Sequence, residues 1–118
     1  MTTVTIYHNP RCSKSRETLA LLRENGVEPE IVLYLETPPD ATALKGVLEK
    51  LGFTSARALM RTKEPLYRSL ELGNTSISEE KLLAAMAAHP ALIERPIVIA
   101  GDQARLGRTP EQVLEIVA

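Results

Sequence analysis

Residues 4–26 read VTIYHNPRCSKSRETLALLRENG and predict a strand, a turn and a helix in direct succession. The β-branched and aromatic run Val4–Tyr7 is typical of a strand. Pro10 ends that run, because proline lacks the backbone N–H that a sheet requires. From Ser13 to Asn25 apolar residues recur at helical spacing, and Gly26 closes the helix. The stretch therefore opens an α/β fold.

Cys12 lies at the turn between this strand and this helix and is the only cysteine of the chain. Amide groups at a helix start favour a thiolate over a thiol, and Lys14 and Arg16 add positive charge nearby. An inert core thiol more often sits within an apolar run, whereas the neighbours of Cys12 are polar. We therefore predict that Cys12 is a reactive nucleophile. His8, four residues earlier, either supports the thiolate or is a turn residue hydrogen-bonded to the backbone.

The spacing around Cys12 excludes three familiar kinds of site. Cys12–Ser15 has the pattern Cys-x-x-Ser, so no second thiol can close a dithiol motif. A low-molecular-weight tyrosine phosphatase needs arginine six positions after its cysteine, where this chain has Thr18. One cysteine and two separated histidines give no zinc-binding spacing, so we expect no metal.

The middle of the chain predicts one strand followed by helices. Glu30–Leu35 is a mostly apolar run, which indicates a second strand that is buried on both faces and parallel to the first. Asp40 and Ser78 are the predicted N-caps of two longer helices, and Thr54 is the predicted cap of a short one. A further short helical piece is expected near Pro65.

The C-terminal part predicts a β-hairpin and a closing helix. Ile97–Ile99 and Ala104–Gly107 are the two expected strands, and turn residues join them. Thr109 and Gln112 form a capping-box pattern, which predicts that the last helix begins there.

The whole order of elements outlines a thioredoxin-like α/β fold. At 118 residues the chain fits a single domain, 1–118, with a helical insertion at about 40–90. In thioredoxin-like folds the proline before the third strand is commonly cis and faces the reactive cysteine. Pro96 matches that position, which would hold Arg95 at the site, and Arg108 is expected at the same edge. Guanidinium groups suit a tetrahedral oxyanion.

Composition narrows the range of partners and compartments. The formal net charge is −1 and no long basic run appears, which argues against nucleic-acid binding. No apolar run approaches the roughly 18 residues of a transmembrane helix, and the start lacks the pattern of a signal peptide. We therefore expect no membrane partner. Because a single cysteine cannot form an intramolecular disulfide, we also expect a cytoplasmic protein.

Five segments together resemble the glutaredoxin-dependent arsenate reductase family, and they occur in the same order over essentially the whole chain. These segments are Tyr7–Arg16, Leu33–Pro39, Arg57–Arg61, Arg95–Val98 and Ala104–Arg108. The chain departs from the members encoded with arsenic-resistance genes at Ser13-Lys14, where those typically carry the smaller Gly-Thr pair.

The resemblance implies a thioredoxin-like fold with an inserted helical subdomain and a reduction of arsenate to arsenite. It implies that Cys12 attacks arsenate and that His8 supports the thiolate. Glutathione, a co-substrate rather than a bound cofactor, would resolve the adduct, and the partner glutaredoxin would reduce the mixed disulfide. The residues that would hold the arsenate or a similar oxyanion are Arg61, Arg95, Arg108, Asn9, Ser15 and Arg16.

The single cysteine fits an external reductant, because a dithiol reductase needs a resolving cysteine in its own chain. Two alternatives stay open. One is a glutathione-dependent thiol oxidoreductase that acts on another substrate. The other is a regulatory protein of the Spx type, which binds RNA polymerase, although the Cys-x-x-Cys switch usual in that group is absent here.

Overall fold

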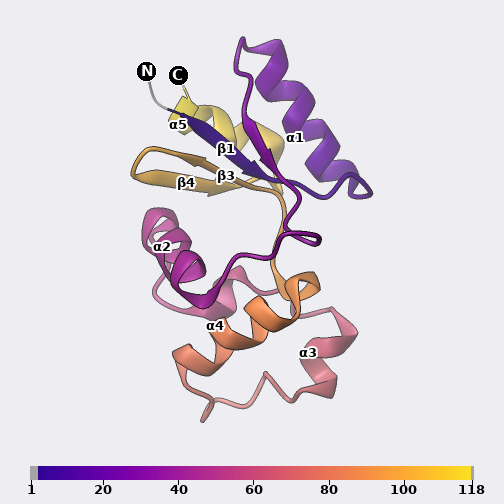
Figure 1. Ribbon diagram of the computed structural model, residues 1–118, viewed down its shortest axis with the longest axis vertical. Helices are drawn as coiled ribbons and strands as arrows, with labels where there is room; N and C mark the ends of the chain where they lie inside the picture. The colour runs from indigo at the N-terminus through magenta and orange to yellow at the C-terminus, as the bar shows by residue number, and fades with distance from the viewer. Residues whose placement is uncertain (1–2, 118) are drawn as a thin grey trace. The chain divides into compact units, whose positions relative to one another are not determined.

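The computed structural model describes residues 3–117, and the chain divides into two units (Figure 1). The first unit runs to Thr37 and resumes at Arg95, and the second is Pro38–Glu94. Within the described range, no helix is long and apolar enough to cross a membrane. The elements in chain order are β1 (Val4–Tyr7), α1 (Ser13–Glu24), β2 (Glu30–Val32), α2 (Ala41–Leu51), the 3-10 helix η1 (Ala56–Leu59), α3 (Pro65–Ser69), α4 (Glu79–Ala88), η2 (Pro90–Leu92), β3 (Ile97–Ala100), β4 (Gln103–Leu106), η3 (Pro110–Val113) and α5 (Leu114–Val117).

The strands of the first unit form one sheet in the order β2-β1-β3-β4 (Figure 1). β2 pairs with β1 in parallel, whereas β3 pairs antiparallel with both β1 and β4. Tyr7 lies opposite Ile97, and Ile97 lies opposite Leu106. The end of β1, the start of β3 and the end of β4 therefore lie at the same end of the sheet. The predicted first strand and the predicted hairpin are confirmed.

Helices cover one face of this sheet. α1 contributes Leu22 to the core and η3 contributes Val113, and both side chains are fully buried. They pack on alternate residues of β1 and β3, which share a face because side chains alternate along a strand. These sheet residues are Val4, Ile6, Val98 and Ala100. The packing fixes α1, and with it the helix start that follows Cys12.

β2 is shorter and more exposed than the sequence predicts. It spans Glu30–Val32 rather than Glu30–Leu35, and Ile31 exposes 39% of its surface. The amide of Glu36 donates a 2.9 Å hydrogen bond to the carbonyl of Leu33, so a turn takes the chain out of the sheet. The prediction of a longer strand buried on both faces was wrong, because the later apolar residues form this turn. The parallel pairing with β1 is confirmed.

The second unit is helical, and its two longer helices begin as predicted. Asp40 accepts a 2.8 Å hydrogen bond from the amide of Ala43 at the start of α2. Ser78 accepts a 3.2 Å bond from the amide of Lys81 at the start of α4. Both side chains satisfy amides that have no partner within their helix. The buried residues of the two helices are Leu44, Val47, Leu48, Leu82, Leu83 and Met86.

The short helix η1 is capped by Ser55 and not, as predicted, by Thr54. The Ser55 hydroxyl accepts a 3.2 Å hydrogen bond from the amide of Arg57. The carboxylate of Glu79 in turn accepts from the Ser55 hydroxyl at 2.9 Å and from the amide of Ala56 at 2.7 Å. This contact between distant parts of the chain selects Ser55, so local sequence alone gave the wrong cap.

The capping box predicted at Thr109 does not form. Thr109 is the N-cap of η3, but its side chain makes no capping hydrogen bond. Its carbonyl instead accepts a 2.9 Å bond from the amide of Gln112, as the tighter 3-10 geometry requires. The chain therefore enters α5 through a 3-10 turn.

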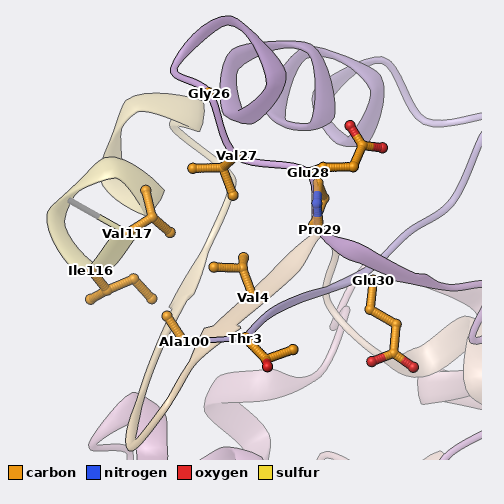
Figure 2. Close-up of a pocket in the computed structure, with 10 residues that line it drawn as sticks. All are labelled: Thr3, Val4, Gly26, Val27, Glu28, Pro29, Glu30, Ala100, Ile116 and Val117. Carbon is orange, nitrogen blue, oxygen red and sulfur yellow. The ribbon is translucent and has the colours of Figure 1, made fainter. Parts of the chain in front are cut away.

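A pocket opens at the other end of the sheet, beside the first residue of β1. Val4 and its partner Ala100 line it together with side chains from α5, from the segment before β2 and from the first residue of β2 (Figure 2). Those further side chains are chiefly Val27, Glu28, Glu30, Ile116 and Val117. None of the described lining residues carries a thiol, an imidazole or a cationic group, so the predicted chemistry is not assigned to this pocket.

Gly107 is held in a close contact that joins α1 to the hairpin. A Cβ atom on Gly107 would lie 2.5 Å from the Cγ of Pro96 and 2.6 Å from the Oγ1 of Thr18. The Gly107 amide also donates a 2.8 Å hydrogen bond to the Pro96 carbonyl. Only glycine lets the end of β4 approach both neighbours so closely.

We therefore expect Gly107→Ala to lower the free energy of unfolding by about 1–3 kcal/mol, the usual cost of overpacking. Urea denaturation followed by circular dichroism measures this change. Gly46→Ala is the matched control, because an added Cβ meets nothing within 4 Å there and alanine favours the middle of α2. Equal stability of Gly107→Ala and the wild type would contradict the proposed close packing.

Candidate active site

A short loop carries the chain from β1 to α1 and ends at Cys12. The Cys12 amide donates a 3.0 Å hydrogen bond to the Asn9 carbonyl, and the Arg11 amide donates to the Asn9 side-chain oxygen at 3.0 Å. Cys12 is the N-cap residue of α1, with an extended backbone and a half-buried side chain. The first turn of α1 holds no acidic residue. The predicted placement of Cys12 is confirmed, at a position where helix amides favour a negative charge.

The buried hydroxyl of Ser15 ties this loop together. Its Oγ lies 2.6 Å from Nδ1 of His8 and accepts a 3.0 Å hydrogen bond from the Asn9 amide. A hydroxyl can both donate and accept, so the His8 ring and the Ser15 hydroxyl share one hydrogen bond whose direction depends on the tautomer of the ring. Three residues of the predicted site therefore form one hydrogen-bonded chain.

His8 is buried, and burial lowers the pKa of its imidazole below the ordinary value of 6.5. The positive charges of Arg23 and Arg16 lower that pKa further. The backbone amide of His8 donates to the Val32 carbonyl at 2.9 Å, which anchors the start of the loop to β2. A neutral His8 acts on the loop through its bond to Ser15, rather than as a positive charge.

Arg16 closes the loop from outside. Its Nη1 donates a 2.8 Å hydrogen bond to the Pro10 carbonyl, across an exposed surface. The guanidinium thus holds the loop residues that precede Cys12. Lys14, on the same turn of α1, forms an exposed ion pair with Glu17 at 3.7 Å.

Arg95 and Arg108 lie at the open end of the hairpin. The Arg95–Pro96 peptide bond is cis, as the sequence analysis anticipates. The bond from the Gly107 amide to the Pro96 carbonyl continues the β3–β4 ladder one step beyond the strands. Arg95 and Arg108 follow at the next step. This is the end of the sheet where β1 releases the loop to Cys12, so the register brings these elements to one edge.

Arg61 belongs to the second unit. Its amide donates a 2.8 Å hydrogen bond to the Leu92 carbonyl, next to an antiparallel bridge between Met60 and Ile93. Its Nη1 lies 3.3 Å from a carboxylate oxygen of Glu64. The first unit thus gathers the loop residues and two arginines at one edge, while the contribution of Arg61 to the site stays a prediction.

Two further residues, not predicted from the sequence, shape this region. Thr18 is fully buried and donates a 2.8 Å hydrogen bond to the Lys14 carbonyl, beside Gly107. Its spacing of three from Ser15 places both on one face of α1, a signal that the sequence contains. Glu64 is the second, and its charge three residues after Arg61 is a comparable signal.

A model of the ArsC family matches residues 7–116 of the chain. The Escherichia coli K12 protein named "Uncharacterized protein YfgD" is 67% identical over 114 residues, which are 97% of this chain and 96% of that protein. The arsenate reductase of Haemophilus influenzae is 54% identical over 114 residues, which are 97% of this chain and 98% of that protein.

A solved structure extends the likeness to three dimensions. The arsenate reductase from Vibrio cholerae superposes with a TM-score of 0.96 at 57% identity, and the match covers 98% of each chain. Together with the family match, this confirms the predicted thioredoxin-like α/β fold.

The lowered pKa of His8 predicts a pH dependence of stability. The unfolded chain binds a proton at His8 near pH 6.5 and the folded protein binds it only at lower pH, so protons favour the unfolded state. The contribution of neutral His8 to the free energy of unfolding is complete above pH 6.5 and is lost as the pH falls through the lowered pKa. We expect the free energy of unfolding to fall less steeply with acid in His8→Asn than in the wild type. Urea titrations at several pH values test this, and parallel slopes would contradict it.

Proposed function

This chain belongs to the ArsC family, and we propose that it reduces arsenate to arsenite through an adduct on Cys12. The observation that carries the proposal is the meeting of three features at one end of the sheet. The only thiol sits at the start of α1, and Arg95 and Arg108 leave the β3–β4 hairpin at the same edge. The arsenate reductases of Haemophilus influenzae and Vibrio cholerae, similar over nearly their whole length, support the substrate.

The first step is a substitution at arsenic. The Cys12 thiolate attacks the arsenic atom, an S–As bond forms, and one As–O bond breaks as that oxygen takes up protons and leaves as water. Arsenic stays in its higher oxidation state. The amide groups at the start of α1 favour the negative charge of the thiolate. Arg95, Arg108 and Arg61 bind the remaining oxygens, since a guanidinium fork matches a tetrahedral oxyanion.

His8, Asn9, Ser15 and Arg16 keep the attacking group in place. The Ser15 hydroxyl joins the His8 ring to the Asn9 amide, and the Arg16 guanidinium holds the Pro10 carbonyl. Because the loop is already ordered, the attack on arsenic requires no further loss of conformational entropy in the loop. Asn9, Ser15 and Arg16 complete the anion pocket in this proposal.

The second step is a two-electron reduction. The thiolate of glutathione attacks the Cys12 sulfur, the S–As bond breaks, and its electron pair stays on arsenic, which leaves as arsenite. The protein is left with a mixed disulfide between Cys12 and glutathione. Glutaredoxin then reduces this disulfide by thiol exchange. An external thiol is needed because Ser15 stands where a dithiol motif has its second cysteine, and the cytoplasm is the compartment that supplies it.

Arsenate-dependent oxidation of NADPH tests the proposal, with glutathione, glutaredoxin and glutathione reductase as the coupling system. We expect turnover by the wild type and none above background by Cys12→Ser, because a hydroxyl is neither a thiolate nor a redox group. The Cys12→Ser protein should unfold at the same urea concentration as the wild type.

Absence of turnover by a folded wild-type protein would overturn arsenate reduction. If mass spectrometry then finds Cys12 readily glutathionylated, the thiol exchange with another substrate becomes the better description. Omitting glutaredoxin and glutathione one at a time tests each partner separately.

Replacing the two arginines at the hairpin end by lysine should weaken the binding of arsenate. We expect Arg95→Lys and Arg108→Lys to raise the KM for arsenate about tenfold, because lysine keeps the charge but loses bidentate hydrogen bonding. Steady-state kinetics over a range of arsenate concentrations measure this. Arg68→Lys, on exposed α3, is the control and should keep the wild-type KM. An unchanged KM in both hairpin variants would remove these arginines from the pocket.

A further inference from the structure

Arg61 and Glu64 are the first and last residues of a tight turn in the second unit. The Glu64 amide donates a 3.0 Å hydrogen bond to the Arg61 carbonyl, which is the bond that closes a four-residue β-turn. The side chains also meet, with Nη1 of Arg61 3.3 Å from Oε2 of Glu64. Their side chains are 29% and 22% exposed, so the pair is only partly open to solvent.

The backbone on both sides of this turn is fixed. The Arg61 amide is bonded to the Leu92 carbonyl at 2.8 Å, and Met60 forms the bridge to Ile93. On the other side, Pro65 begins α3 and holds Glu64 in an extended conformation, as proline does with the residue before it. The folded backbone therefore holds the two residues at the ends of one turn, where their side chains meet.

Glu64 has no other evident task at its position. It is the N-cap residue of α3, yet its side chain makes no capping hydrogen bond. Its ion pair with Arg61 lacks hydrogen-bond geometry, whereas three hydrogen bonds join Arg23 and Glu28. A guanidinium has five N–H donors, so one contact with a carboxylate leaves Arg61 able to bind a second anion.

We infer that Glu64 competes with the oxyanion for Arg61 and so sets the affinity for the anion. The inference rests on the proposed function, in which Arg61 binds arsenate. An arsenate that binds Arg61 either displaces the Glu64 carboxylate or shares the guanidinium with it, and like charges repel in both cases. Glu64 is thus an affinity-setting residue that keeps anion binding weak.

The competition weakens the binding of charged ligands and not that of uncharged ones. Arsenate and phosphate carry the same charge and nearly the same shape, so Glu64 weakens both alike. Only arsenate goes on to react with a thiol. Arsenite is uncharged near neutral pH, so its release does not depend on Glu64. A weak first complex therefore keeps unreactive phosphate from holding the site.

Equilibrium binding to the unreactive Cys12→Ser protein tests the inference, with sodium arsenate and sodium phosphate as the probes in calorimetry. We expect Glu64→Gln to lower the Kd for both anions about three- to fivefold, the effect of a partly exposed ion pair. Glu115→Gln is the matched control, because it removes the same charge and breaks the 3.0 Å pair with Arg105. That variant should keep the Kd of the Cys12→Ser parent.

A double substitution locates the effect at Arg61. In the Arg61→Gln background, Glu64→Gln should no longer tighten binding if the two side chains act on each other. Tightening that persists in that background, or unchanged, weaker or undetectable binding in Glu64→Gln, would overturn the inference. In the otherwise wild-type chain, Glu64→Gln should lower KM by the same factor and leave kcat unchanged.

The turnover assay separates this result from the proposed function. If the wild type turns over arsenate and Glu64→Gln leaves the Kd unchanged, the role of Glu64 is refuted and the proposed function stands. Tighter anion binding in Glu64→Gln without any arsenate turnover supports the role of Glu64 and refutes arsenate reduction.

Discussion

The antiparallel pairing of Tyr7 with Ile97 determines which residues can meet in the first unit. It places the end of β1 beside the start of β3, and the hairpin adds the end of β4 at the same edge. The loop to Cys12 and the two flanking arginines depend on this alignment. A shift by one residue would turn every side chain of β3 to the other face and take Val98 out of the core. Core packing therefore enforces the register that the candidate site needs.

The loop from β1 to Cys12 is held by polar groups that satisfy one another. Ser15 is fully buried, and its hydroxyl serves both the His8 ring and the Asn9 amide. A buried polar group that lost its partner would cost about 1–3 kcal/mol, so each bond in this chain stabilises the loop conformation. Within residues 3–117 no group of metal-binding side chains supplements it. Hydrogen bonding and the packing of α1 together present Cys12 at the helix start.

Local sequence patterns predicted the elements that depend on local physics. The strand Val4–Tyr7, the helix after Cys12 and the caps Asp40 and Ser78 followed from side-chain type and spacing. The choice of Ser55 over Thr54 did not, because it depends on a carboxylate 24 positions away. The position of Cys12 at a helix start was predictable from the sequence, whereas the hydrogen-bonded chain through Ser15 was visible only in the three-dimensional structure. The position of Pro96 and the expected hairpin pointed to Arg95 and Arg108, and the family resemblance added Arg61. Their distribution over two units came only from the structure.

The double duty of the Ser15 hydroxyl constrains how this chain can evolve. A single substitution, Ser15→Cys, would convert Cys-x-x-Ser into the motif of a dithiol oxidoreductase. A thiol is larger and a weaker hydrogen-bond partner than a hydroxyl, so the same change would loosen His8 and the Asn9 amide from the helix. A variant that gained a second thiol at position 15 would therefore lose the order of the loop that presents Cys12. The buried hydrogen bonds of Ser15 therefore disfavour a second thiol at this position.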